Sequence, residues 1–235
     1  MATEETRRML ILQGKLKELG LFHHLPATAP IRFIDVGWGG KETETVALLG
    51  NVLPMSSCLE KPTVYYRFEG IEEYLTYLSF DADKMNDADV NSPATCYLQW
   101  ARINVKGDLQ YATGRDVFRW QPAVADERTP PHRIFIVVAS QEREVDLSSI
   151  PVIATNSKEG RARFEFAAFA KRYGLRGFVG ANCFRVSFEP MVAQRITSNL
   201  RDSIELDASG RKVVSETNNG VKVVYGPLPA TTGAA

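Results

Sequence analysis

Residues 133–140 read RIFIVVAS, and this stretch decides the fold of the chain. It holds six apolar residues in a row, and four of them are branched at Cβ. A short apolar run of this kind is typical of a central strand that is covered on both faces. We therefore expect a sheet with further layers packed on either side of residues 133–140.

After this strand, residues 157–174 (SKEGRARFEFAAFAKRYG) are predicted to form a helix that stops at Gly174. Residues 175–189 are predicted to form two short strands around Ala181-Asn182. Residues 191–206 favour a helix, because apolar residues recur at every fourth position. The last predicted element is a hairpin, residues 212–226, whose Asn219-Gly220 suits a two-residue turn.

Before the central strand, residues 95–105 (TCYLQWARINV) alternate as a strand does, and residues 31–36 and 62–68 are also predicted strands. Residues 71–78 (IEEYLTYL) are predicted to be helical, since Ile71, Leu75 and Leu78 fall on one helix face. Residues 81–93 are predicted to form a polar loop.

The chain opens with a predicted amphipathic helix that ends near Gly20. Its apolar stripe must be buried, either in the chain's own core or on a neighbouring copy, because a lone helix of this length is marginal in water. We assign the stripe to self-association, which predicts a homo-oligomer. The stripe consists of Leu12, Leu16 and Leu19.

Together these elements predict an α+β fold in which a mixed or antiparallel sheet packs with two to four helices. We expect the N-terminal helix over residues 1–24, a single α+β domain over residues 31–226 and a disordered tail over residues 227–235. The length and composition are those of an ordinary globular domain, with 44% hydrophobic and 24% charged residues.

The charges balance, with 28 basic and 28 acidic residues, but they are unevenly placed. Residues 31–126 carry 14 acidic and 9 basic side chains, whereas residues 158–201 carry 9 basic and 3 acidic ones. Any anionic partner, an RNA or a membrane surface, is therefore expected at the later segment. The residues assigned to this contact are Arg161, Arg163, Lys171, Arg172 and Arg176.

Motifs for catalysis, metal binding or nucleotide binding are missing from the sequence. No phosphate-binding loop, dinucleotide fingerprint or Gly-x-Ser-x-Gly elbow occurs, and no Cys-x-x-Cys pair seeds a zinc site. We expect no catalytic residue, no metal and no cofactor. The three cysteines are odd in number and widely spaced, which favours a reducing intracellular compartment. No apolar run is long enough to span a bilayer.

From about residue 68 to 188, the order of predicted elements resembles the folded core of rhabdovirus matrix proteins. The resemblance lies in RIFIVVAS, in FEFAAFAKRYGL (residues 164–175) and in FRVSF (residues 184–188). It implies a viral structural protein that self-assembles and joins the viral ribonucleoprotein to an anionic membrane surface. Such a protein would occupy the virion and the host cytoplasm or nucleus.

Two features of animal-infecting matrix proteins are missing, the long basic N-terminal arm and the Pro-Pro-x-Tyr motif. The chain is therefore more similar to the plant-infecting branch. A viral RNA-binding or nucleocapsid-like protein remains an alternative, with Tyr173 and Phe178 as stacking surfaces. A cysteine-dependent enzyme is a second one, with Cys58, Cys96 or Cys183 as the nucleophile.

Overall fold

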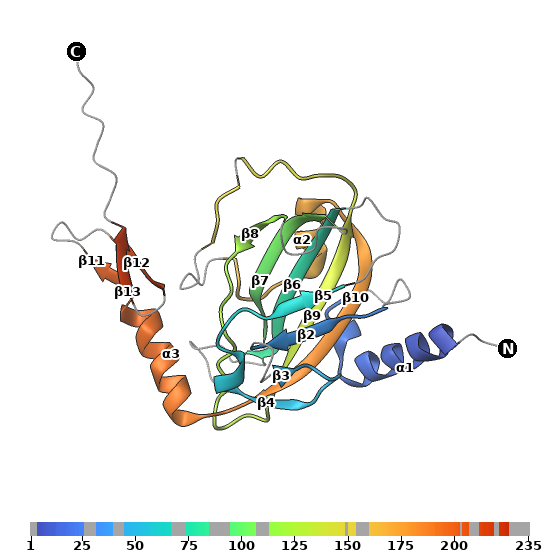
Figure 1. Ribbon diagram of the computed structural model, residues 1–235, viewed down its shortest axis with the longest axis horizontal. Coiled ribbons are helices and arrows are strands. Elements are labelled where there is room, and N and C mark those ends of the chain that lie inside the picture. Colours follow the sequence, from blue (N-terminus) through green and yellow to red (C-terminus); the bar gives the residue numbers. More distant parts are fainter. Residues whose placement is uncertain are drawn as a thin grey trace, which may run out of the picture. The chain divides into compact units, whose positions relative to one another are not determined.

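The computed structural model of the chain confirms the α+β class (Figure 1). Contacts divide the chain into two compact units, Met1–Pro190 and Met191–Ala235. We predicted no boundary at Pro190. The structure describes residues 4–25, 32–39, 45–66, 74–84, 95–106, 113–148, 150–153, 160–202, 204–206, 212–218 and 221–225.

The first unit is built on a mixed sheet of seven strands, here called the main sheet. Strand β9 lies between β6 and β10, which confirms the predicted central strand (Figure 1). Its neighbours pair with it antiparallel, whereas β1 and β4 run parallel to β10. In spatial order the strands are β1 (Arg32–Phe33), β10 (Leu175–Ser187), β9 (His132–Gln141), β6 (Tyr74–Lys84), β7 (Thr95–Lys106) and β8 (Arg115–Phe118), with β4 (Val52–Pro54) also on β10.

Two helices and a short 3-10 turn share one hydrophobic core with one face of the main sheet. Strand residues Phe80, Phe135 and Cys183 belong to this core, and so do Leu12 and Leu16 of the first helix. Phe80 and Phe135 are cross-strand partners whose ring centroids lie 5.4 Å apart. The covering elements are α1 (Glu4–Glu18), η1 (Leu21–His23) and α2 (Phe166–Tyr173).

The other face of the main sheet contacts a small sheet of three strands in the order β3-β2-β5. The ring of Trp38 packs edge-on against Phe184 of β10, with 4.9 Å between the centroids. The Asn182 amide donates hydrogen bonds to the carbonyls of Ile34 and Ala47. The small-sheet strands are β2 (Asp35–Trp38), β3 (Thr45–Val46) and β5 (Thr63–Tyr65), and the turn η2 (Met55–Cys58) follows β4.

The structure corrects three sequence predictions. The predicted helix over residues 71–78 is wrong in its described part, because Tyr74–Lys84 forms β6, where pairing with two neighbouring strands overrides the local pattern. Residues 175–189 hold one long strand rather than two, since the backbone of the small-sheet segment satisfies the Asn182 side chain. The second helix begins only at Phe166, because Ala162 bridges to Tyr97 in a strand-like pair.

The second unit holds α3 and a three-stranded sheet. The helix favoured by the four-residue repeat is confirmed up to Asp202 as α3 (Pro190–Asp202), but its predicted last residues, 204–206, form a strand that pairs with a neighbouring one. The predicted hairpin is confirmed by the antiparallel pairing of β12 (Lys212–Asn218) with β13 (Val221–Tyr225). A further strand, β11 (Ile204–Leu206), pairs with β12. The turn Asn219-Gly220 and the tail 227–235 lie outside the described residues.

Candidate functional site: two acid–base pairs at one end of the main sheet

Two acidic residues at the end of β6 meet two basic residues at the start of β9. The strands are antiparallel, and Asp81 is the register partner of Ile134. The carboxyl end of β6 therefore lies beside the amino end of β9, which begins with His132 and Arg133. We call this region the polar end of the main sheet.

The Asp81–His132 pair faces the small sheet, and both side chains are 1% exposed. Asp81 lies on the same face as its partner Ile134, which is in register with the Phe184 that packs against Trp38. Nδ1 of His132 lies 2.9 Å from Oδ2 of Asp81. The pair thus lies buried on the face of the main sheet that also contacts the small sheet.

Hydrogen bonds hold His132 at both ring nitrogens. Nε2 lies 3.0 Å from the Thr129 hydroxyl oxygen, which in turn lies 3.0 Å from the carbonyl oxygen of Asp126. Nδ1 lies against Asp81, whose Oδ1 also accepts the backbone N–H of Asp83, at 2.9 Å. Both side chains of the pair are therefore held in place by partners on two sides.

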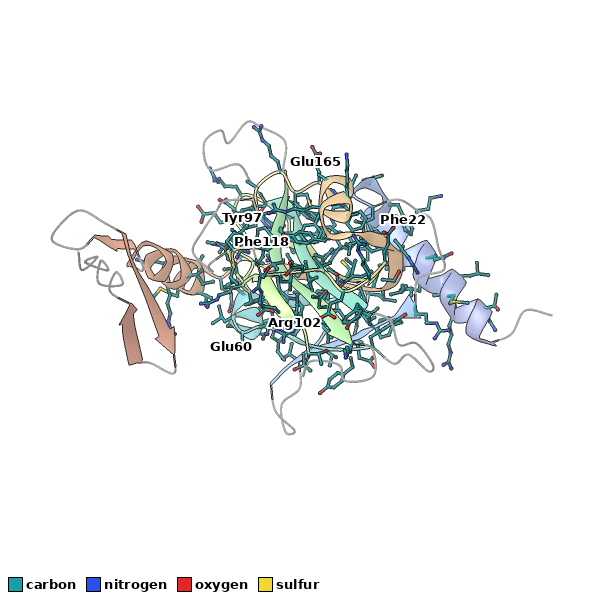
Figure 2. All side chains as sticks on the ribbon, turned by 90° about the horizontal axis from the view of Figure 1, so that it is seen from above. Phe22, Glu60, Tyr97, Arg102, Phe118 and Glu165 are labelled. Carbon is teal, nitrogen blue, oxygen red and sulfur yellow. The ribbon has the colours of Figure 1, made fainter. Side chains whose placement is uncertain are left out.

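Further polar side chains extend the buried cluster beside Asp81. Tyr97 is the register partner of Asp81 on β7, and its hydroxyl donates to Oε1 of Gln121, at 3.0 Å. Both Tyr97 and Gln121 are 8% exposed. Arg161 connects Tyr97 with Phe118, both labelled in Figure 2. The guanidinium of Arg161 lies 5.5 Å from the centre of the Phe118 ring, and the next residue, Ala162, forms a β-bridge with Tyr97.

The Asp83–Arg133 pair faces the first helix and is partly open to water. Nε and Nη2 of Arg133 donate to the two Asp83 oxygens, and Nη1 donates to the carbonyl of Leu19, at 2.8 Å. Burial acts to raise the pKa of Asp83, but the hydrogen bonds and charge of Arg133 outweigh it and lower the pKa below 3.8. The pair therefore joins the end of α1 to the main sheet.

Gly20 makes this contact with α1 possible. Its φ of +83° lies in the left-handed region, and a Cβ there would approach Nη1 of Arg133 to 2.7 Å. Glycine is thus needed at residue 20, where the first helix is predicted to stop, for two reasons: the backbone has a positive φ, and the Arg133 side chain approaches closely. Next to it, His24 packs edge-on against Phe80, and burial followed by the charge of Arg133 lowers its pKa.

The structure corrects the assignment of Arg161 to an exposed anion contact. Its side chain is fully buried, and its guanidinium donates to the carbonyls of Leu98, Gln99 and Arg119. Burial lowers the pKa of Arg161 to about 10. Arg161 therefore ties β7 to the segment after β8, because three main-chain carbonyls converge on it.

The other predicted anion-contact residues are exposed but are spread over three local structures. Arg163 lies in the turn before α2 with φ +54°, Lys171 and Arg172 lie in the last turn of α2, and Arg176 lies on β10. Their contact with an anionic surface stays a prediction.

The leucine stripe assigned to self-association is buried in the first unit's own core. Leu12, Leu16 and Leu19 are 3%, 0% and 2% exposed. The assignment is wrong, because these side chains pack on the main sheet and offer no surface to a second copy. Of the two partners that the amphipathic pattern allowed, the core is the one observed.

The cysteines lack the environment of a nucleophile. Burial raises the pKa of Cys58 and of Cys183 to about 12, and it raises that of Cys96 as well. Within the described residues, no histidine hydrogen-bonds a cysteine, and no cluster of three or more His, Cys, Asp or Glu residues is placed to hold a metal. None of the described helices is both long enough and apolar enough to cross a membrane.

Comparison with known proteins identifies the fold. No protein-family model matches the chain. A carboxypeptidase Y inhibitor, solved in complex with its cognate proteinase, aligns over 77% of this chain and 96% of its own, with 16% identity and a TM-score of 0.57. The phosphatidylethanolamine-binding protein of Plasmodium vivax aligns over 75% and 97%, with 16% identity and a TM-score of 0.56.

A phosphatidylethanolamine-binding protein of Plasmodium falciparum aligns over 74% of this chain and 96% of its own, with 15% identity and a TM-score of 0.53. At these identities the likeness shows the fold alone. It overturns the predicted viral matrix function and supports neither alternative, the RNA-binding protein or the cysteine enzyme. One element behind the viral resemblance, the helix over residues 71–78, is a strand in its described part.

Sequence reasoning missed the polar end, although two signals pointed to it. Asp81 and Asp83 directly follow the apolar run of β6, and His132 and Arg133 directly precede that of β9. Polar residues at the ends of two apolar strands suggest a shared sheet edge. The predicted loop over residues 81–93 is wrong for Asp81–Lys84, which belong to β6. With these residues in a loop, the sequence does not predict that the ends of the two strands are neighbours.

Proposed function

We propose that this chain is a binding protein without catalytic turnover, and that its ligand is a phospholipid headgroup of the phosphoethanolamine type. Two proteins that share its fold along nearly their whole length are named for binding phosphatidylethanolamine. This support is an analogy of fold, so the argument for a site must come from this chain's own residues.

The polar end of the main sheet has the charges that a zwitterionic headgroup requires. Phosphoethanolamine carries a phosphate and an ammonium group, and the polar end holds basic and acidic groups within a few residues of each other. The partly open pair supplies both charges, since Arg133 matches the phosphate and Asp83 matches the ammonium. A bound zwitterion would pair its phosphate with Arg133 and its ammonium with Asp83, in place of the ion pair between these two residues. The total charge of the site would stay unchanged.

The partly open pair offers the way in. Arg133 and Asp83 keep 31% and 25% of their side-chain surface in water, whereas Asp81 and His132 are enclosed. A headgroup would therefore meet Arg133 first, with the buried pair holding the arginine's strand in position behind it. The observation that carries the proposal is this adjacency of one solvent-accessible pair and one buried pair on neighbouring residues of β6 and β9.

The surroundings favour binding over catalysis. The cysteine thiols are held protonated by burial, which removes the commonest nucleophile from the described residues. His132 is held between two hydrogen-bond partners and has no free nitrogen with which to move a proton to a substrate.

Titration of the protein with O-phosphoethanolamine and with a short-chain phosphatidylethanolamine, followed by calorimetry and amide NMR, tests the proposal. Shifts should concentrate at residues 81–84 and 132–133. Arg133→Met should weaken binding about tenfold, because a charge-assisted pair with phosphate is lost. Arg143→Gln, which removes an exposed arginine just beyond the far end of β9, is the matched control.

The parent and the control should bind alike, and thermal unfolding should show both variants folded. Lack of saturable binding by the parent would overturn the proposal, as would equal binding by Arg133→Met. Phosphate alone binding as tightly as phosphoethanolamine would replace the zwitterion with a simple anion.

A further inference from the structure

A pocket opens on the small sheet, away from the polar end. Its volume is about 120 Å³, and it is lined by residues of β1, β2, β3 and β5. It shares no lining residue with the two acid–base pairs. The lining includes two aromatic residues, Phe33 and Tyr65, the aliphatic residues Val46 and Leu48, and Asp35 and Gly37.

Strand register explains the shape of this pocket. Asp35 on β2 and Tyr65 on β5 are direct cross-strand partners, so their Cβ atoms lie about 5 Å apart on one face. Gly37 follows two residues later on that face, and it pairs with Val46 on one side and Thr63 on the other. Without a side chain at residue 37, a hollow is left between its larger neighbours.

The pocket rim keeps apolar surface in water. Phe33, Tyr65 and Leu48 are 42%, 48% and 60% exposed. These are three of the large hydrophobic residues that the described part of the first unit leaves open to solvent, and they gather around one hollow. Exposed apolar side chains scattered singly need no explanation, but a cluster around a cavity marks a binding site.

The charge of the pocket selects the ligand class. Among the lining residues that the structure describes, Asp35 is the one charged side chain, so an anion would be repelled there and a cation attracted. Two aromatic rings beside one carboxylate form the arrangement that binds organic cations through their π faces. An apolar ligand without charge would leave the Asp35 carboxylate desolvated and unpaired.

We propose that this pocket binds a quaternary ammonium group. A cavity of about 120 Å³ corresponds to roughly four water volumes, which suits a trimethylammonium group. Such a group makes no hydrogen bonds, so a lining that is mostly apolar costs it little. A primary ammonium would lose hydrogen bonds to water that the single Asp35 carboxylate replaces only in part. This inference is independent of the headgroup site proposed above.

Choline is the probe. Its neutral isostere 3,3-dimethyl-1-butanol is the matched ligand control, because the two molecules have nearly the same shape and differ in charge. Amide NMR titration should give saturable binding of choline at about millimolar concentration, with shifts at residues 33–37, 46–48 and 63–65. The isostere should bind at least about fivefold more weakly, because it lacks the charge. Glycerophosphocholine in a third arm shows whether a lipid-type choline also enters.

Asp35→Asn should weaken choline binding about fivefold and leave the affinity for the isostere unchanged. Gly37→Val should remove binding of both ligands by filling the hollow, and the backbone allows it since Gly37 does not have a positive φ. Glu142→Gln removes an exposed carboxylate on another loop and should change nothing. Equal binding of choline and its isostere, or no saturable choline binding, would overturn the proposal. So would unchanged binding by both pocket variants.

Discussion

The two faces of the main sheet hold acid–base pairs that differ in one respect, their access to water. Both pairs join β6 to β9 at the same end, and their residues are neighbours in sequence. The Asp81–His132 side chains are 1% exposed, while Arg133 and Asp83 are 31% and 25% exposed. A third pair, Lys15–Glu18 on α1, is 39% and 66% exposed.

This gradient teaches that burial sets what a charged pair contributes. Water screens an exposed pair, so its removal changes little. A buried pair is neutral as a unit, and removing one partner leaves a charge with nothing to compensate it. At the polar end, the buried Asp81–His132 pair therefore stays paired, whereas the partly exposed Asp83–Arg133 pair can open to bind an external zwitterion.

The largest expected effect comes from breaking the buried pair. His132→Leu should lower the free energy of unfolding by about 3–5 kcal/mol, because Asp81 is left enclosed with only the backbone N–H of Asp83 as a partner. Urea unfolding measures the loss. The double variant with Asp81→Leu should recover much of it, since no buried charge remains. Additive losses in the double variant would show that the pair is not coupled and would break the comparison.

Removal of a buried cation that donates to three main-chain carbonyls should come second. Arg161→Met should destabilise the protein by about 2–3 kcal/mol, because three main-chain carbonyls lose a donor while the cost of burying a charge is also removed. Chemical denaturation again provides the measurement. Arg163→Met, two residues away and exposed, is the control. If the Arg161 variant were as stable as the parent, these hydrogen bonds would contribute nothing net.

The partly open pair should have a smaller effect that depends on pH. Asp83→Asn should cost about 1–2 kcal/mol at neutral pH after allowance for solvent screening. Because folding lowers the pKa of Asp83, its contribution is complete above the unfolded-state pKa near 3.8 and is lost as pH falls through the folded value. Melting temperatures of variant and parent should converge as pH drops from 6 to 2. A constant gap would contradict the ionic origin.

The smallest effect is expected at the surface. Lys15→Gln should change the free energy of unfolding by less than about 0.5 kcal/mol, because the Lys15–Glu18 pair is exposed and screened. Differential melting against the parent in low and high salt provides the measurement. If Lys15→Gln lowered the free energy of unfolding as much as Asp83→Asn does, burial would not explain the different contributions of the three pairs.

Local features of the fold followed from the sequence. The apolar run of β9 predicted a central strand, and the four-residue repeat predicted α3, since both depend on a side-chain pattern within one element. Gly20 and Gly174 predicted helix ends because both adopt the positive φ that suits glycine. The strand β6 was missed, because its pattern fitted a helix face and only its two neighbouring strands decided the matter.

The sequence by itself therefore determined the α+β class, the central strand and the helix ends at Gly20 and Gly174, all of which depend on residues close together in the chain. The tertiary structure alone decided which charges meet. Asp81 and His132 are 51 residues apart, and the antiparallel register of β6 and β9 brings them to hydrogen-bond distance. The tertiary structure also decided that Arg161 is buried and that the stripe of Leu12, Leu16 and Leu19 faces the core. An amphipathic or charged pattern states what a side chain requires, and only the packing of distant segments supplies the partner.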